Sequence, residues 1–405
     1  MGITRRSALI AAASSILTVT AACGAPDNSG AVGDSNGEVP QQPKKAVTLN
    51  VLDVAGNLQL TQGMIDEFVK NNPDVISRVT YSKSPAPELA GKIKAQQNAG
   101  RVDIGLVLTG VDGLAAGVDQ GLWLDVLPKF EDRLPGMKDY LEPAAAMQKL
   151  AGNAGVTVTY YPSGPLLEYL PAKVPNPPTS AEELLAYAKA HPGKVQYARP
   201  SNSGPGRTFL MGLPYILGDK DPKDPVNGWD KTWAYLKELN QHVSYYPSGT
   251  TETMKNLANG SVEVIASTTG WDINPRVLGT VPKEAKVSSM RGFHWVTDAH
   301  YAVIPKGVST DTQAAVLALL KFMLTPEQQA KAFDDGYFYP GPAVKGVELS
   351  MAPQKSQDAI RNFGRPEYDA LIANNPTEVP LEPKALVAAF DRWDREIGSG
   401  KVKQG

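Results

Sequence analysis

Short apolar runs alternate with longer amphipathic segments along the first third of the chain. Residues 47–53 alternate apolar and polar side chains with the period of two that is typical of a strand. Apolar side chains recur at helical spacing in residues 62–71 and 85–100, and residues 77–81 and 103–108 are further strand-like runs. This order of strand and helix predicts an α/β fold in which helices cover both faces of a mainly parallel sheet.

A second series of the same kind follows. It contains strand-like runs at 156–161, 195–198, 262–267 and 301–304 and helical patterns at 180–190, 208–217, 229–240, 251–258, 311–324 and 382–397. The chain has 405 residues, which is more than one hydrophobic core usually takes. The two series therefore predict two lobes, each with its own sheet.

The ends of the predicted strands supply the first candidate ligand contacts. In open α/β sheets, ligands bind beyond the carboxyl ends of the strands. Gly56 and Asn57 follow the first strand, and Thr109 ends the third. Tyr160 and Tyr161 end a strand of the second series. Because side chains alternate along a strand, one of the two tyrosines should face the ligand and the other should pack.

A glycine-rich loop before a predicted helix supplies the next candidates. Residues 201–207 read Ser-Asn-Ser-Gly-Pro-Gly-Arg. Ser201, Ser203 and Arg207, together with the free N–H groups of the helix start, would favour an anion. The alternative is a capped helix start with an arginine on the surface.

A similar loop follows the strand at 262–267. Residues 268–272 read Thr-Thr-Gly-Trp-Asp. Thr268 and Thr269 would lie at the strand end, glycine would permit close approach, and Trp271 would stack on a ligand. The alternative is a helix that starts with an aspartate and a tryptophan in the core.

The N-terminal residues have the pattern of an export signal. Arg5 and Arg6 precede an apolar run of small residues that ends in Ala-Ala-Cys23. This ending resembles a bacterial lipobox and predicts lipidation of Cys23, and the two arginines also resemble a twin-arginine signal. Ordinary cleavage near this point, and general rather than twin-arginine export, are the alternatives. Residues 24–46 are small and polar and predict a flexible tether.

Composition narrows the function further. The net charge of −2 gives no basic surface for nucleic acid. One cysteine and four histidines without a metal-binding motif predict no metal site, and no cofactor motif is present. The chain also lacks the nucleophile elbow and the phosphate-binding loop of common enzymes, so we expect no catalytic site. A secreted hydrolase is the first alternative, and an adhesive surface protein is the second.

Three segments carry a resemblance to a known family. They are the helix start Pro178-Thr-Ser-Ala-Glu-Glu-Leu-Leu185, the turn and strand Asn259-Gly-Ser-Val-Glu-Val-Ile265, and the stretch from Phe293 to Pro305 with the later helix end Leu324-Thr-Pro-Glu-Gln-Gln329. In this order and spacing the chain resembles the type II periplasmic solute-binding proteins of ABC importers, in the branch that binds polyamines, thiamine and ferric ion. The resemblance implies two lobes hinged by crossover strands.

The resemblance also implies a division of the chain. After a signal segment at 1–23 and a tether at 24–46, lobe 1 would contain 47–157 and 293–345. Lobe 2 would contain 158–292, and the C-terminal helices at 346–405 would pack on lobe 2. In these proteins the loop at 201–207 lies in the cleft. Trp295 and Asp298 resemble the tryptophan and aspartate with which polyamine binders hold an amine. The alternative is a tryptophan in the core and an aspartate in solvent.

Two departures leave the ligand open. Thr268 and Thr269 stand where ferric-ion binders carry adjacent tyrosines, and the tryptophan that polyamine binders carry near Thr268 is absent. The contacts predicted above would suit a thiamine-like, polyamine-like or amino-carboxylate solute. The expected partners are ABC permease subunits, with a lipid anchor as the only membrane contact, and the protein is expected to be a monomer outside the cytoplasm.

Overall fold

The computed structural model describes residues 37–54 and 56–403. The predicted signal segment at 1–23, with Cys23, and residues 24–36 of the predicted tether lie outside the described residues. Within the described part of the chain, no helix has both the length and the apolar character needed to cross a membrane.

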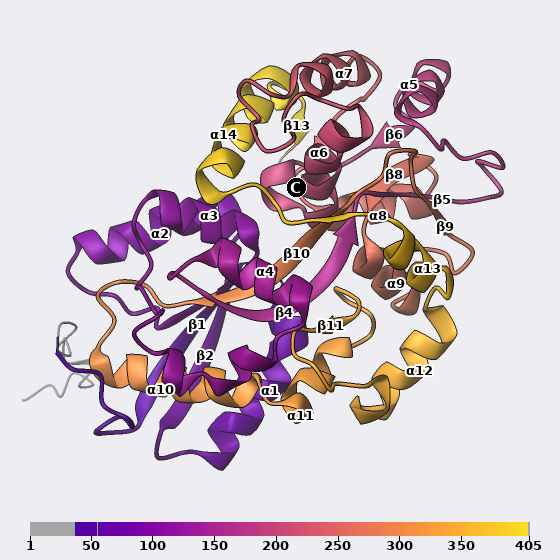
Figure 1. The fold of residues 1–405 in the computed structure, drawn as a ribbon. Helices are drawn as coiled ribbons and strands as arrows, with labels where there is room; N and C mark the ends of the chain where they lie inside the picture. The colour runs from indigo at the N-terminus through magenta and orange to yellow at the C-terminus, as the bar shows by residue number, and fades with distance from the viewer. Residues whose placement is uncertain (1–36, 55, 404–405) are drawn as a thin grey trace, which may run out of the picture. The chain divides into compact units, whose positions relative to one another are not determined.

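The larger sheet contains strands from the beginning, middle and end of the chain. Its order is β11 (Gly341–Pro342), β4 (Val156–Gly164), β10 (Trp295–Val303), β3 (Leu106–Thr109), β1 (Val47–Asp53) and β2 (Ile76–Lys83), and β12 (Thr377–Glu378) pairs with β10. β1 is parallel to β2 and β3, whereas β10 is antiparallel to β3 and β4. All nine residues of β4 and of β10 are buried, as expected for strands in the middle of a covered sheet (Figure 1).

Helices cover this sheet through their apolar faces. α1 (Leu58–Asn71) buries its apolar side chains and packs beside α10 (Thr310–Met323), which continues into the short α11 (Pro326–Gln329). α4 (Glu142–Ala151) contacts β4 and β10. α3 (Val111–Asp119) contacts β3, β10 and α2 (Ala86–Asn98). Because only Gly110 separates β3 from α3, the N-terminus of α3 lies at the carboxyl end of that strand.

The smaller sheet has the order β6 (Val195–Gln196), β8 (Val264–Ser267), β5 (Leu166–Tyr169) and β9 (Lys286–Ser288). β6 is parallel to β8, and β5 is antiparallel to β8 and β9. The helices of this part are α5 (Ala181–Ala190), α6 (Gly204–Ile216), α7 (Asp230–Asn240), α8 (Thr250–Ala258) and α9 (Thr269–Val277). Two of them follow a strand of this part almost directly: α8 comes after β7 (Tyr246–Pro247) and α9 after β8. α6 follows β6 after a loop that contains the 3-10 turn Pro200–Asn202.

The chain passes between the two sheets twice. β4 ends at Gly164 and β5 begins at Leu166, and the return runs from β9 to β10. The predicted α/β class with two sheets and crossover strands is confirmed. The prediction that each sheet is mainly parallel is wrong, because both sheets are mixed. The crossover strand β10 runs antiparallel to β3 and β4, and the hydrophobic pattern alone does not report strand direction.

The last segment of the chain contacts both parts. α12 (Gln354–Phe363) packs on α9, α13 (Glu367–Asn374) follows it, and β13 (Val402–Lys403) pairs with β7. α14 (Pro383–Trp393) contacts both parts: it packs against α3 of the larger part (Figure 1), and Trp393 at its end packs on Tyr197 and Tyr246 of the smaller part. The family resemblance predicts that residues 346–405 pack on lobe 2 alone, whereas the structure distributes them over both parts.

Candidate functional site

A cavity of about 270 Å³ is lined by elements of both sheets. From the larger sheet come Gly56, before α1, and Asp112, in the first turn of α3. The part with the smaller sheet contributes the first turns of the helices α6, α8 and α9. Helix starts carry N–H groups without intrahelical partners and a partial positive charge, so this wall favours anionic groups.

Local hydrogen bonds fix these helix starts. The Ser203 hydroxyl accepts from the Gly206 amide at 3.1 Å and lies 2.7 Å from the Thr250 hydroxyl, so it joins the starts of α6 and α8. The Thr268 hydroxyl caps α9 by accepting from the Trp271 amide. These serine and threonine caps are the residue types that helix starts require.

Gly270 permits α9 to approach the segment at 337–339. A Cβ atom built at Gly270 would lie 2.2 Å from the backbone nitrogen of Phe338, so any larger residue would force the two segments apart. Beside this contact, the Thr269 hydroxyl donates to the Tyr339 carbonyl at 2.8 Å. The close approach brings Trp271 to the cavity beside Tyr337.

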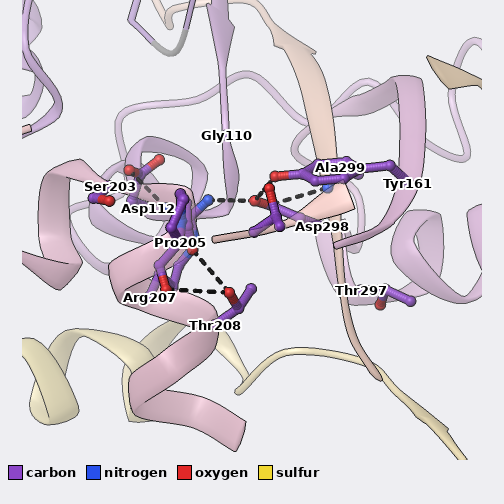
Figure 2. A network of polar contacts seen from close by, with 12 residues as sticks. Gly110, Asp112, Tyr161, Ser203, Pro205, Arg207, Thr208, Thr297, Asp298 and Ala299 are labelled. Carbon is purple, nitrogen blue, oxygen red and sulfur yellow. Dashed lines mark hydrogen bonds and ion pairs between the residues drawn. The ribbon is translucent and has the colours of Figure 1, made fainter. Parts of the chain in front are cut away.

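Arg207 is the centre of a buried ion-pair network (Figure 2). Its Nη1 lies 2.9 Å from Asp112 Oδ2, and its Nη2 lies 2.5 Å from Asp298 Oδ2. The Tyr161 hydroxyl donates to the same Asp298 oxygen at 2.8 Å. Only 4% of Arg207 and 2% of Asp298 are exposed. Two carboxyl groups thus face one guanidinium group, so the network offers acceptor oxygens to a further cationic group.

Burial sets the protonation of the neighbouring groups. Burial, aided by the Arg207 charge, lowers the pKa of His300 to about 3, so this cavity-lining imidazole is neutral at pH 7. Burial raises the pKa of Asp298, and the Arg207 charge opposes that rise. Within the described residues, Arg207 Nε and His300 Nδ1 are buried without a hydrogen-bond partner. Such atoms gain most from a solute that completes their hydrogen bonds.

Aromatic side chains form another wall. The ring centroids of Trp271 and Tyr337 are 5.6 Å apart in an edge-to-face arrangement, and those of His300 and Phe338 are 4.2 Å apart. Phe338 has a φ of +54°, which a bulky residue rarely adopts. A conformation of this kind persists only where the surroundings impose it, and it concentrates at binding sites. The wall offers aromatic faces and edges to a ring or to an organic cation.

The structure brings six of the sequence-predicted residues together. Gly56, Ser203, Arg207 and Trp271 line the cavity. Tyr161 and Asp298 lie behind Arg207 in the ion-pair network. Thr268 caps α9 and Thr269 donates to the Tyr339 carbonyl, and neither residue lines the cavity.

Five other predicted residues, Trp295 among them, lie outside both the cavity wall and the ion-pair network. Tyr160 packs in the main hydrophobic core, on the side of β4 opposite Tyr161. The buried Thr109 hydroxyl donates to the Gly110 carbonyl, the Asn57 amide donates to Asp53 Oδ1, and Ser201 is not part of the cavity wall.

Trp295 requires a correction. The family resemblance predicts that its ring covers a ligand, with a core tryptophan as the alternative, and the structure shows the alternative: Trp295 is fully buried in a separate core cluster. Its ring packs edge-to-face on Phe293, and its Nε1 donates to the Leu371 carbonyl. The physical reason is that Trp295 is the first residue of the covered strand β10 rather than part of a loop before a strand.

Several cavity residues were not predicted. Thr250 and Thr251 start α8 after Gly249, the same strand-to-helix pattern that pointed to residues 201–207 and 268–272. Asp112 stands three residues after Thr109. His300 is two residues from Asp298 on the same strand, so the alternation of side chains placed it on the same face. No sequence signal pointed to Tyr337 and Phe338, which lie in an irregular segment.

Comparison with known proteins identifies the family. The model of the bacterial extracellular solute-binding proteins matches residues 63–361, most of the chain. Protein YnjB of Escherichia coli (strain K12) is 24% identical over 345 residues, which cover 78% of this chain and 81% of that protein.

Two solved structures show the same fold. A putative spermidine/putrescine ABC transporter protein from Listeria monocytogenes has a TM-score of 0.60 at 16% identity, covering 87% of this chain and 99% of its own. A periplasmic thiamin binding protein has a TM-score of 0.60 at 14% identity, covering 89% and 99%. With the two-lobed fold and the cavity between elements of both sheets, the family match establishes that the chain belongs to the bacterial extracellular solute-binding proteins.

Proposed function

We propose that this chain captures one small polar solute in the cavity described above and closes its two lobes around it. The observation that carries the proposal is the composition of the wall, which draws on both sheets and leaves Arg207 Nε and His300 Nδ1 buried without partners in the described part of the chain. A site whose contacts come from two lobes is complete only when the lobes meet, so binding and closure are linked.

The chemistry of the wall favours a thiamine-like, polyamine-like or amino-carboxylate solute. The excess carboxylate of the Asp112–Arg207–Asp298 network and the aromatic pair Trp271 and Tyr337 suit an ammonium group or a cationic ring. The helix starts and Arg207 Nε suit a carboxylate. The names of two structural relatives, a spermidine/putrescine transporter protein and a thiamin binding protein, agree with this range.

Delivery to a membrane transporter completes the proposed role. Proteins of this family and fold are the substrate-binding parts of ABC importers, so the closed, loaded form would dock on permease subunits. The alternative of a secreted hydrolase finds no support in the family or in the fold.

Solute-driven closure is tested with the compound that the protein itself retains. Denaturing the purified protein should release a small molecule that mass spectrometry identifies. Returning that compound to solute-free protein should decrease the radius of gyration in X-ray scattering and change tryptophan fluorescence, because Trp271 lies at the cavity. The same scattering data should give the mass of a monomer. Tight binding with an unchanged radius would contradict a closing receptor and favour a rigid binding module.

We also propose that Cys23 carries a lipid that holds the protein at the outer face of a membrane. The basis is the small-residue sequence before the only cysteine. A Cys23→Ser variant should move from the membrane fraction to the soluble fraction, since one cysteine offers one site. An unchanged membrane fraction for Cys23→Ser would exclude this anchor.

A further inference from the structure

Arg207 pairs with two carboxylates that belong to different elements of the fold. Asp298 is on β10, a strand by which the chain passes between the sheets, and α6, which carries Arg207, packs against β10 and β4. Asp112 is on α3, which covers the larger sheet. Figure 2 shows Arg207 bonded to Asp112 on one side and to Asp298 on the other.

The two ion pairs respond differently when the lobes separate. Displacement in a hinge motion grows with distance from the hinge, and the hinge lies at the crossover strands. In such a motion the Arg207–Asp298 pair, at a crossover strand, would stay formed, whereas the Arg207–Asp112 pair, which joins helices of different lobes, would break. With Asp298 still in contact, opening would not leave Arg207 as a buried charge without a partner, which is strongly unfavourable.

A second contact between the lobes lies near the Arg207–Asp112 pair. The Ala86 amide, at the start of α2, donates to Asn202 Oδ1 at 3.3 Å, and Asn202 Nδ2 donates to the Ser248 carbonyl. α2 packs on α3, and Asn202 immediately precedes the Ser203 cap of α6. The hydrogen bond to Asn202 therefore protects the Ala86 amide from exchange with solvent while the lobes are together. Asp112 takes no part in that hydrogen bond, so exchange at Ala86 reports lobe separation independently of the Asp112 contact.

We infer that Asp112 is a closure residue: its carboxylate holds α3 to Arg207 in the closed form and releases it in the open form, while Asp298 keeps Arg207 in place in both. Asp112 acts through Arg207 and so positions the lobes. The inference rests on the proposed closing mechanism and adds which residue sets the balance between open and closed forms before any solute binds.

Hydrogen exchange of the full chain tests this inference without added solute. Pro85 and Pro87 have no amide hydrogen, so mass spectrometry can isolate the Ala86 amide within a short peptide. Asp112→Asn should speed exchange at Ala86 by about tenfold, the effect of losing one charge-assisted hydrogen bond. Asp119→Asn, an exposed aspartate on the same helix, should leave the rate unchanged, and Asp112→Glu should restore most of the protection because it keeps the charge.

Scattering provides an independent measurement on the same variants. Asp112→Asn should have a larger radius of gyration than Asp119→Asn, with the same circular dichroism and therefore the same fold. Equal exchange rates and equal radii in the two variants would overturn the role of Asp112. Neither measurement uses a solute, so a failure of solute-driven closure in the wild type would overturn the proposed function and leave this result standing.

Discussion

Replacing Arg207 with methionine should lower the free energy of unfolding by about 3–5 kcal/mol, the cost of removing one partner of a buried ion pair. Methionine retains much of the apolar stem of arginine, so the decrease in unfolding free energy arises mainly from removal of the guanidinium charge. Asp298 would remain 2% exposed, and its side chain would keep only the Tyr161 hydroxyl and the Ala299 amide as hydrogen-bond partners among the described residues. Urea unfolding at pH 7 measures the effect.

The matched control is Arg101→Met. Arg101 lies 2.8 Å from Asp103, close to the distances in the Arg207 network, but its side chain is 60% exposed and that of Asp103 is 50% exposed. Exposed pairs contribute about 0–1 kcal/mol, so burial is the variable that differs. Adding Asp298→Asn to Arg207→Met should recover much of the loss by removing the unpaired charge. If Arg207→Met were no more destabilising than Arg101→Met, the network would not be a buried one in solution.

The architecture was accessible from the sequence because it depends on local patterns. The period of two at residues 47–53 and the helical period at 62–71 require only that side chains alternate or recur on one face. The mixed direction of the sheets was not accessible. β4 and β10 are buried over all nine residues, and the period of two that marks a strand is the same whichever way the strand runs.

Some residues of the site could be predicted from the sequence and others could not. The predictable ones lie at turns from strand to helix, where this fold class binds ligands; they are Gly56, Ser203, Arg207 and Trp271. Tyr337 and Phe338 lie in an irregular segment that packs closely on Gly270, and Phe338 has a φ of +54°. Neither the close packing nor the backbone angle produces a periodic pattern in the sequence. Asp112 was missed for another reason: its role depends on a pairing with Arg207, 95 residues away.

His300 should make the folded state sensitive to mild acid. Its pKa is about 3 in the folded protein, because burial and Arg207 disfavour the imidazolium, against about 6.5 in the unfolded chain. The folded state therefore binds fewer protons, and the stabilisation from His300 is complete above pH 6.5. It is lost as the pH falls toward 3, at up to about 1.4 kcal/mol per pH unit.

The measurement is the difference in unfolding free energy between wild type and His300→Asn at several pH values. Carboxylates titrate in the same range, but they are common to both proteins and largely cancel in this difference. The wild type should lose stability relative to His300→Asn as the pH decreases from 6.5 to 4. His191→Asn is the control for the substitution itself, since the exposed His191 stacks on Tyr187 at the surface. A flat difference for His300→Asn would mean that the imidazole takes up its proton in the folded protein, which requires water or a counter-charge to reach it inside the cavity.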